Sequence, residues 1–113
     1  MARELTKGDL PALILAVLAD QACHGYAIAR KIERDSQQTF QLKEGTLYPT
    51  LRALELEGLI TGDWELQTSG PARRVYRITE KGRFELDKKR GEWNTYVRTM
   101  QALLGGLPDA QPA

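Results

Sequence analysis

The sequence has few of the residues from which disulfides, metal sites and membrane spans are built. Its single cysteine, Cys23, cannot form a disulfide within the chain, and its single histidine, His24, has no second histidine to complete a metal site. No apolar run approaches the roughly 20 residues of a membrane-spanning helix. The first seven residues are too polar for a signal peptide. We therefore expect a cytoplasmic protein without a metal or other cofactor.

Signs of catalysis are also lacking. No nucleophile has an evident base, no glycine-rich loop suits a phosphate, and no carboxylate pair stands on an apolar background. We therefore expect that the protein is not an enzyme. Cys23 follows an apolar helix, so we expect a buried and inert thiol rather than an oxidation sensor. His24 is expected in a loop or at a helix cap.

The chain has 113 residues, of which 42% are hydrophobic and 27% charged, as in one ordinary globular domain. The net charge of +1 carries no information about nucleic acid. Between residues 70 and 90, however, eight basic residues stand against three acidic ones. That local excess fits either phosphate neutralisation or a solvated surface.

Hydrophobic spacing predicts three helices in the first half of the chain. The first is predicted to begin with Thr6 as its N-cap and to run to about residue 19. Leu15, which falls off its apolar stripe, is expected to contact another element such as a partner subunit. The second spans residues 27–35 and the third residues 44–57, ended by Gly58. We place Pro49 in or near the first turn of the third helix, where proline is tolerated.

An extended segment from Leu59, a turn at residues 69–72 and a return strand over residues 73–78 predict a hairpin with a basic tip. Three helices followed by a hairpin is the winged-helix order. The predicted fold is therefore mainly α with a small β-hairpin, a winged helix-turn-helix over residues 1–78.

A last helix is predicted from Glu80, capped by Thr79, to Leu104, which makes it about 38 Å long. This is too long for so small a core, and its apolar residues follow a coiled-coil-like spacing, which implies a partner helix. We therefore expect a dimerisation helix over residues 79–105 and a flexible tail over 106–113. The expected dimer contacts are Leu15, Leu86, Trp93, Tyr96, Val97, Met100 and Leu104.

The third helix has the composition of a recognition helix. Its polar side carries small, polar or basic residues, while Glu55 and Glu57 make its far end acidic, so its amino-terminal half is expected in the major groove. The hairpin arginines are expected on phosphates or along a minor groove, as a wing. The residues expected to bind DNA on these grounds are Lys43, Thr46, Pro49, Thr50, Arg52, Arg73 and Arg74.

A set of short motifs lies along the chain: His24-Gly25-Tyr26-Ala27-Ile28, Gly45-Thr46-Leu47-Tyr48-Pro49, Leu54-Glu55, Gly58-Leu59-Ile60, Trp64 and Gly70-Pro71-Ala72-Arg73-Arg74. Through these motifs the sequence resembles the PadR-like family of winged-helix regulators, over about residues 10 to 104. Where members usually have Arg-Lys-Tyr-Tyr after the wing turn, this chain has Arg73-Arg74-Val75-Tyr76.

The resemblance implies a homodimer, usually a repressor, of the short type with a single carboxy-terminal helix. It also implies that Tyr48 and Thr46 contact DNA, that Arg73 and Arg74 act in the wing, and that Trp93 lines a pocket for a hydrophobic or aromatic effector. A plain dimer-core role for Trp93 stays open.

The function predicted is a sequence-specific, DNA-binding transcriptional regulator, a homodimer on a pseudo-palindromic operator. Two alternatives stay open. The chain could be a winged-helix module that binds a partner protein, or a small-molecule or redox-sensing dimer without a DNA role.

Overall fold

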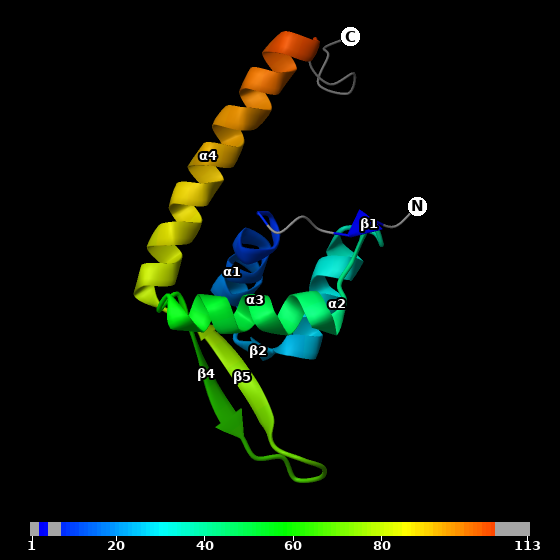
Figure 1. Cartoon of the computed structure of the whole chain (residues 1–113), viewed down its shortest axis with the longest axis vertical. Helices are drawn as coiled ribbons and strands as arrows, with labels where there is room; N and C mark the ends of the chain where they lie inside the picture. The colour runs from blue at the N-terminus through cyan, green and yellow to red at the C-terminus, as the bar shows by residue number, and fades with distance from the viewer. Residues whose placement is uncertain (1–2, 5–7, 106–113) are drawn as a thin grey trace.

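The computed structural model describes residues 3–4 and 8–105 (Figure 1). Helices dominate the described residues and the strands are short, as predicted. In chain order the elements are β1 (Arg3–Glu4), α1 (Leu10–Asp20), β2 (Cys23–His24), α2 (Gly25–Asp35), β3 (Phe40–Gln41), α3 (Glu44–Leu56), β4 (Ile60–Glu65), β5 (Arg73–Ile78) and α4 (Glu80–Leu104). The predicted tail over 106–113 lies outside the described residues, and the division at residue 78 stays a prediction.

The sheet is antiparallel in the order β2-β5-β4. The β4–β5 ladder runs from Ile60 opposite Ile78 to Glu65 opposite Arg73. β2 adds Cys23 opposite Tyr76, on the other side of β5. The sequence pattern predicted the hairpin but missed β2, and Cys23 therefore lies in a strand rather than at a helix end. A separate parallel pair joins β1 to β3.

Helix α1 is the centre of the core and contacts α2, α3, α4 and β5. Because neighbours surround it, α1 is buried on more than one side. Leu15 is 0% exposed and Leu86 of α4 is 3% exposed within one chain. The prediction that these two residues contact a partner subunit is therefore wrong, since each is already covered by its own chain.

Local signals fix the ends of the later helices. Thr79 Oγ1 accepts a hydrogen bond from the Gly82 amide at 3.0 Å, which caps α4 as predicted. Gly58 and Gly105 end α3 and α4 with φ values of +77° and +99°, a conformation that favours glycine. The predicted bounds of α4 are confirmed. The predicted start of the first helix is wrong, because α1 begins at Leu10 with Asp9 at its N-cap.

Pro49 is the exception to the predicted local pattern. It lies inside α3, as the sixth helical residue, and not in the first turn. Proline lacks the amide that would bond the Gly45 carbonyl. Gly45 is exposed, so water can satisfy this carbonyl.

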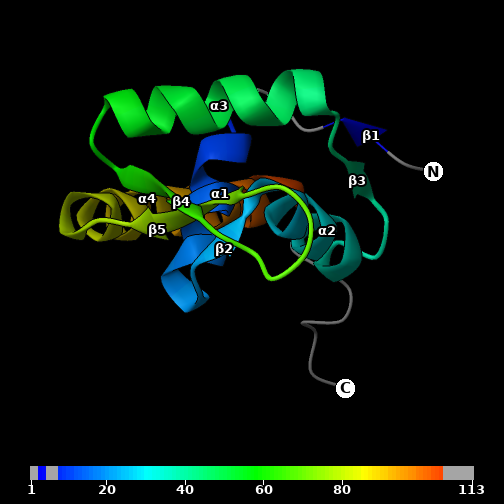
Figure 2. The same cartoon turned by 90° about the horizontal axis from the view of Figure 1, so that it is seen from below.

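The wing and the outer half of α4 point to opposite ends of the molecule (Figure 1). Only the first turns of α4 pack on the core, where Gly82 and Leu86 are its buried residues. Figure 2, seen from the hairpin's end, shows α3 running alongside β4 and β5. The molecule therefore presents two separate surfaces.

Gly82 and Gly91, both within α4, give a matched test of this packing. A Cβ on Gly82 would lie 2.1 Å from the Leu59 carbonyl oxygen, whereas a Cβ on Gly91 would meet nothing within 4 Å. We expect Gly82→Ala to lower the free energy of unfolding by about 1–3 kcal/mol. Gly91→Ala is expected to raise it by up to about 1 kcal/mol, the ordinary helix preference for alanine.

Urea unfolding of both variants measures the difference. Equal stabilities would show that α4 does not approach Leu59 as closely as described.

Candidate nucleic-acid interface

Helix α3 exposes one side beside the wing. Lys43 at its N-cap, Pro49 and Arg52 are exposed, whereas Thr46 and Thr50 are half-buried. Thr50 Oγ1 donates a hydrogen bond to the Thr46 carbonyl at 2.7 Å, so its hydroxyl is already engaged within the helix. These residues do share a surface region, and their contacts with DNA stay predictions.

Tyr48 connects α3 to the start of α2. A Cβ added to Gly25 would lie 2.8 Å from Tyr48 Cε1 and 2.9 Å from its Oη, so the ring lies directly over the glycine. Only a residue without a side chain leaves that space. The amino-terminal turn of α2 is thereby held against α3, and 44% of the Tyr48 surface remains exposed beside it.

His24 caps α2, as the sequence allowed, with Nδ1 3.4 Å from the Ala27 amide nitrogen. On the opposite side of the ring, Arg73 Nη1 contacts Nε2. A neutral imidazole has one acceptor nitrogen, and both the Ala27 amide and Arg73 are donors. The two ring nitrogens therefore cannot both accept at the same time, and each tautomer of the ring accepts only one of the two hydrogen bonds. His24 thus joins the tip end of β5 to the start of α2.

The wing tip is braced by a side chain. Arg73 Nε donates to Gln67 Oε1 at 2.6 Å, and Gln67 Nε2 donates to the Pro71 carbonyl. Gly70 supplies the turn with a φ of +87°. Arg73 stays exposed, as predicted for a wing residue, while Leu66 at 90% exposure is an apolar tip residue that the sequence pattern did not single out.

Arg74 was predicted to contact DNA, and the structure gives it a different position. Its guanidinium donates to both carboxylate oxygens of Glu55, at 3.2 and 2.7 Å, and to the Gly62 carbonyl at 3.0 Å. It also lies 5.9 Å from the Trp64 ring centroid and 5.7 Å from that of Tyr76. The sequence pattern missed Glu55 as a partner because 19 positions separate the two residues. Arg74 is therefore turned toward its own chain.

The basic stretch over residues 70–90 does not form one patch. Lys81 Nζ donates to the Glu57 carbonyl at 2.8 Å, at the end of α3, and Arg90 Nη1 lies 3.7 Å from Asp87 Oδ1 on α4. Lysine at a helix carboxyl end stabilises the exposed carbonyls there. Part of the local charge excess is thus structural.

A second exposed surface lies on the outer part of α4. The rings of Trp93 and Tyr96 are 5.6 Å apart and each is more than half exposed, Leu104 is exposed, and Val97 and Met100 are half-buried. A groove along α1 continues from these rings past Leu13 and Ala16.

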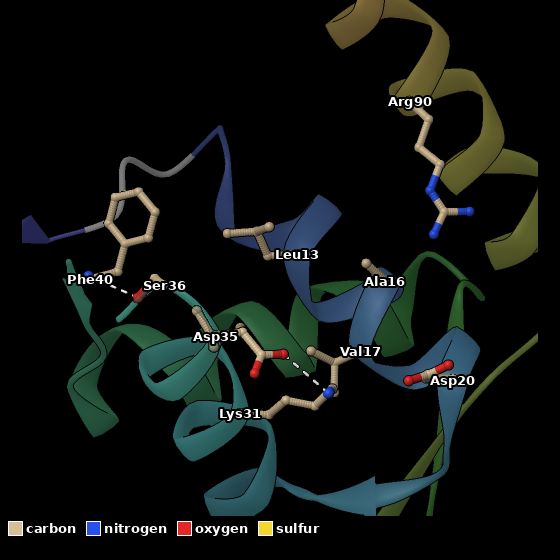
Figure 3. A pocket seen from close by; sticks show the side chains of 10 residues that line it. Leu13, Ala16, Val17, Asp20, Lys31, Asp35, Ser36, Phe40 and Arg90 are labelled. Carbon is tan, nitrogen blue, oxygen red and sulfur yellow. Dashed lines mark hydrogen bonds and ion pairs between the residues drawn. The ribbon is translucent and has the colours of Figure 1, made fainter. Parts of the chain in front are cut away.

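The far part of this groove has a mixed lining (Figure 3). Leu13 and Val17 of α1 and Phe40 of β3 give it an apolar floor, and the Lys31–Asp35 ion pair of 3.1 Å forms one wall. Lys31 also lowers the pKa of Asp35 by hydrogen bonding. Arg90 reaches toward the groove from α4.

Neither a metal site nor a membrane helix is found in the described part of the chain. No group of three His, Cys, Asp or Glu side chains is placed to hold a metal ion. No described helix is long and apolar enough to cross a membrane. Burial raises the pKa of the Cys23 thiol, which disfavours the reactive thiolate.

Helices α1 to α3, followed by the β4–β5 hairpin of a three-stranded antiparallel sheet, define a winged-helix protein with an added carboxy-terminal helix. A family model described as "Transcriptional regulator PadR-like family" matches residues 14–88. The chain belongs to this family, as the resemblance in its motifs indicated.

Similar proteins extend the match to nearly the whole chain. The transcriptional regulator Rv3488 of Mycobacterium tuberculosis is 36% identical over 104 residues, which cover 92% of this chain and 91% of the relative. The crystal structure of smu.1704 from Streptococcus mutans has a TM-score of 0.80 at 28% identity and covers 94% of this chain and 95% of its own. The PadR-like regulator BC4206 of Bacillus cereus has a TM-score of 0.76 at 31% identity, covering 89% and 96%.

Proposed function

We propose that this transcriptional regulator binds duplex DNA as a homodimer on a pseudo-palindromic operator. The observation that carries the proposal is the convergence of α3, the start of α2 and the wing at one end of the molecule (Figure 1). The recognition helix would enter the major groove through its amino-terminal half, with Thr46, Tyr48 and Arg52 nearest the bases and backbone. Arg73 would contact phosphates beside it.

The proposed dimer contact lies at the opposite end of the molecule, on the outer half of α4. A single chain leaves the Trp93–Tyr96 pair and Leu104 uncovered, next to a groove with an apolar floor. Exposed apolar surface of this kind marks an association site. In the proposed dimer, the outer half of α4 from one chain lies in the α1 groove of the other, through Trp93, Tyr96, Val97, Met100 and Leu104.

The second part of the proposal is that a small-molecule effector releases the regulator from DNA. Trp93 and Tyr96 present flat apolar faces at the proposed dimer contact, which suits a hydrophobic or aromatic small molecule. Such a molecule would change the angle between the two α4 helices and with it the separation of the two recognition helices. The regulator would then act as a repressor released by its effector, as the family resemblance implies.

Salt dependence of DNA binding tests the assignment of the DNA-facing end. We expect wild-type affinity for duplex DNA to fall steeply with salt, and Arg52→Ala and Arg73→Ala each to reduce the log–log slope by about 0.9 per lost phosphate contact. Lys88→Ala, which removes an exposed charge from the middle of α4, is the matched control and should leave the slope unchanged. Fluorescence anisotropy at several salt concentrations gives the slopes. Equal slopes for all four proteins would contradict the assignment.

Sedimentation equilibrium tests the dimer. The 12.7 kDa chain should sediment at twice its mass, and Trp93→Ala should raise the dimer dissociation constant by about tenfold or more, because a large apolar contact is lost. Phe84→Ala removes another exposed aromatic residue, from the first turns of α4, and should leave association unchanged. A monomeric wild type, or a Trp93→Ala variant that associates as tightly as wild type, would refute this interface.

A further inference from the structure

The guanidinium of Arg74 is held at the junction of three elements. Glu55 belongs to the last turns of α3, Gly62 and Trp64 to β4, and Tyr76 to β5. The ion pair is bidentate, which fixes orientation as well as distance. We call these residues the Arg74 clamp: Glu55, Gly62, Trp64, Arg74 and Tyr76.

The clamp is a built arrangement and not a chance surface pair. A Cβ on Gly62 would lie 3.0 Å from Arg74 Cζ and Nη2, so the glycine leaves the space that the guanidinium occupies. Both side chains of the ion pair are largely buried, with 34% of Arg74 and 21% of Glu55 exposed. The Arg74 Nε is covered and has no hydrogen-bond partner in the described residues. The bidentate ion pair and the Gly62 carbonyl are therefore the hydrogen bonds that hold the guanidinium in place.

The outer half of the wing has few other attachments. Ile60, Val75 and Tyr76 bury the base of the hairpin in the core, whereas Asp63, Trp64 and Glu65 are exposed. Beyond that base, the Arg74 clamp ties one face of the hairpin to α3. The Arg73–His24 contact ties the opposite face to the start of α2.

Small rotations at this point have large effects at the tip. Gly70, at the wing tip, is four residues from Arg74, or roughly 13 Å along an extended chain. If the hairpin rotated by about 10° about Arg74, the tip would therefore move by about 2 Å. A displacement of that size breaks hydrogen bonds made at the tip.

We propose that Arg74 and Glu55 are positioning residues that set the wing at a fixed angle to the recognition helix, and that DNA affinity depends on this angle. The inference rests on the proposed DNA-binding function. Arg74 acts through the wing and does not touch DNA itself.

The charge of Glu55 makes the test sharp. Removing a carboxylate near a DNA-facing surface should tighten binding if only the electrostatic field matters. The clamp predicts the opposite: Glu55→Gln keeps the shape, loses the bidentate ion pair and weakens binding by roughly tenfold. Glu57→Gln, two residues further along and exposed, removes the same charge and should leave binding equal or slightly tighter.

Arg74→Met and the Glu55→Gln/Arg74→Met double variant complete a double-mutant cycle. We expect the double variant to bind no more weakly than the weaker single variant, because both substitutions break one contact. The salt slope should match wild type in all three variants. An Arg74→Met slope lower by about 0.9, with Glu55→Gln unchanged, would make Arg74 a phosphate contact and overturn the proposal. Additive losses, or a Glu55→Gln variant that binds as tightly as wild type, would also overturn it.

A measurement without DNA separates this proposal from the function on which it rests. In a Trp93→Phe background Trp64 is the only tryptophan, and loss of the guanidinium beside its ring should change its fluorescence in Glu55→Gln but not in Glu57→Gln. Urea unfolding confirms that each variant is folded. If the wild type binds no duplex, the proposed function fails and the role in affinity fails with it. If the wild type binds and Glu55→Gln behaves like Glu57→Gln in both assays, only the clamp fails.

Discussion

Burial of α1 is the constraint on which the rest of the structure depends. Leu10, Ile14 and Leu15 are 0% exposed, and the helix contacts α2, α3, α4 and β5. A chain of this size can build only one core. Helices α2, α3 and α4 and strand β5 therefore all pack against α1. Helix α3 and the base of the wing are both packed against this core, and their mutual orientation follows from it.

Helix α4 extends well beyond the core. Leu86 is its last buried residue, yet 18 further residues of α4 continue to Leu104. Helical propensity alone gives this segment little stability in water, because isolated helices are marginal. Exposed Trp93 and Tyr96 on such a segment are consistent with an apolar surface that another copy covers. Helix α4 therefore joins the end of the molecule proposed to face DNA to the surface proposed for dimer contact.

Local signals allowed much of the fold to be predicted from the sequence. The bounds of β5 and α4 were predicted because they depend on nearby residues, such as the Thr79 cap and the Gly105 stop. β2 was missed because a two-residue strand forms only through its partner in β5, some 50 positions away. Leu15 was assigned to a dimer contact because the sequence pattern was interpreted as a helix buried on one side only. In the structure, α1 is covered on several sides.

The residues of the candidate site likewise fall into those that the sequence could predict and those that it could not. Composition predicted the polar side of α3 and the exposed position of Arg73, since both depend on a single element. It could not distinguish Arg73 from Arg74, because the difference lies in Glu55 and the two aromatic rings around it. Neighbouring arginines on a strand point to opposite faces, and only the tertiary structure shows what each face meets.

The most direct test of the account is a hydroxyl-radical footprint on a duplex enriched by this protein from a random pool. The account predicts an inverted repeat with two protected patches on one face of the duplex, about one helical turn or 34 Å apart, because two recognition helices are presented by one dimer. A single protected patch would contradict the dimeric arrangement. Failure to enrich any sequence would contradict sequence-specific DNA binding itself.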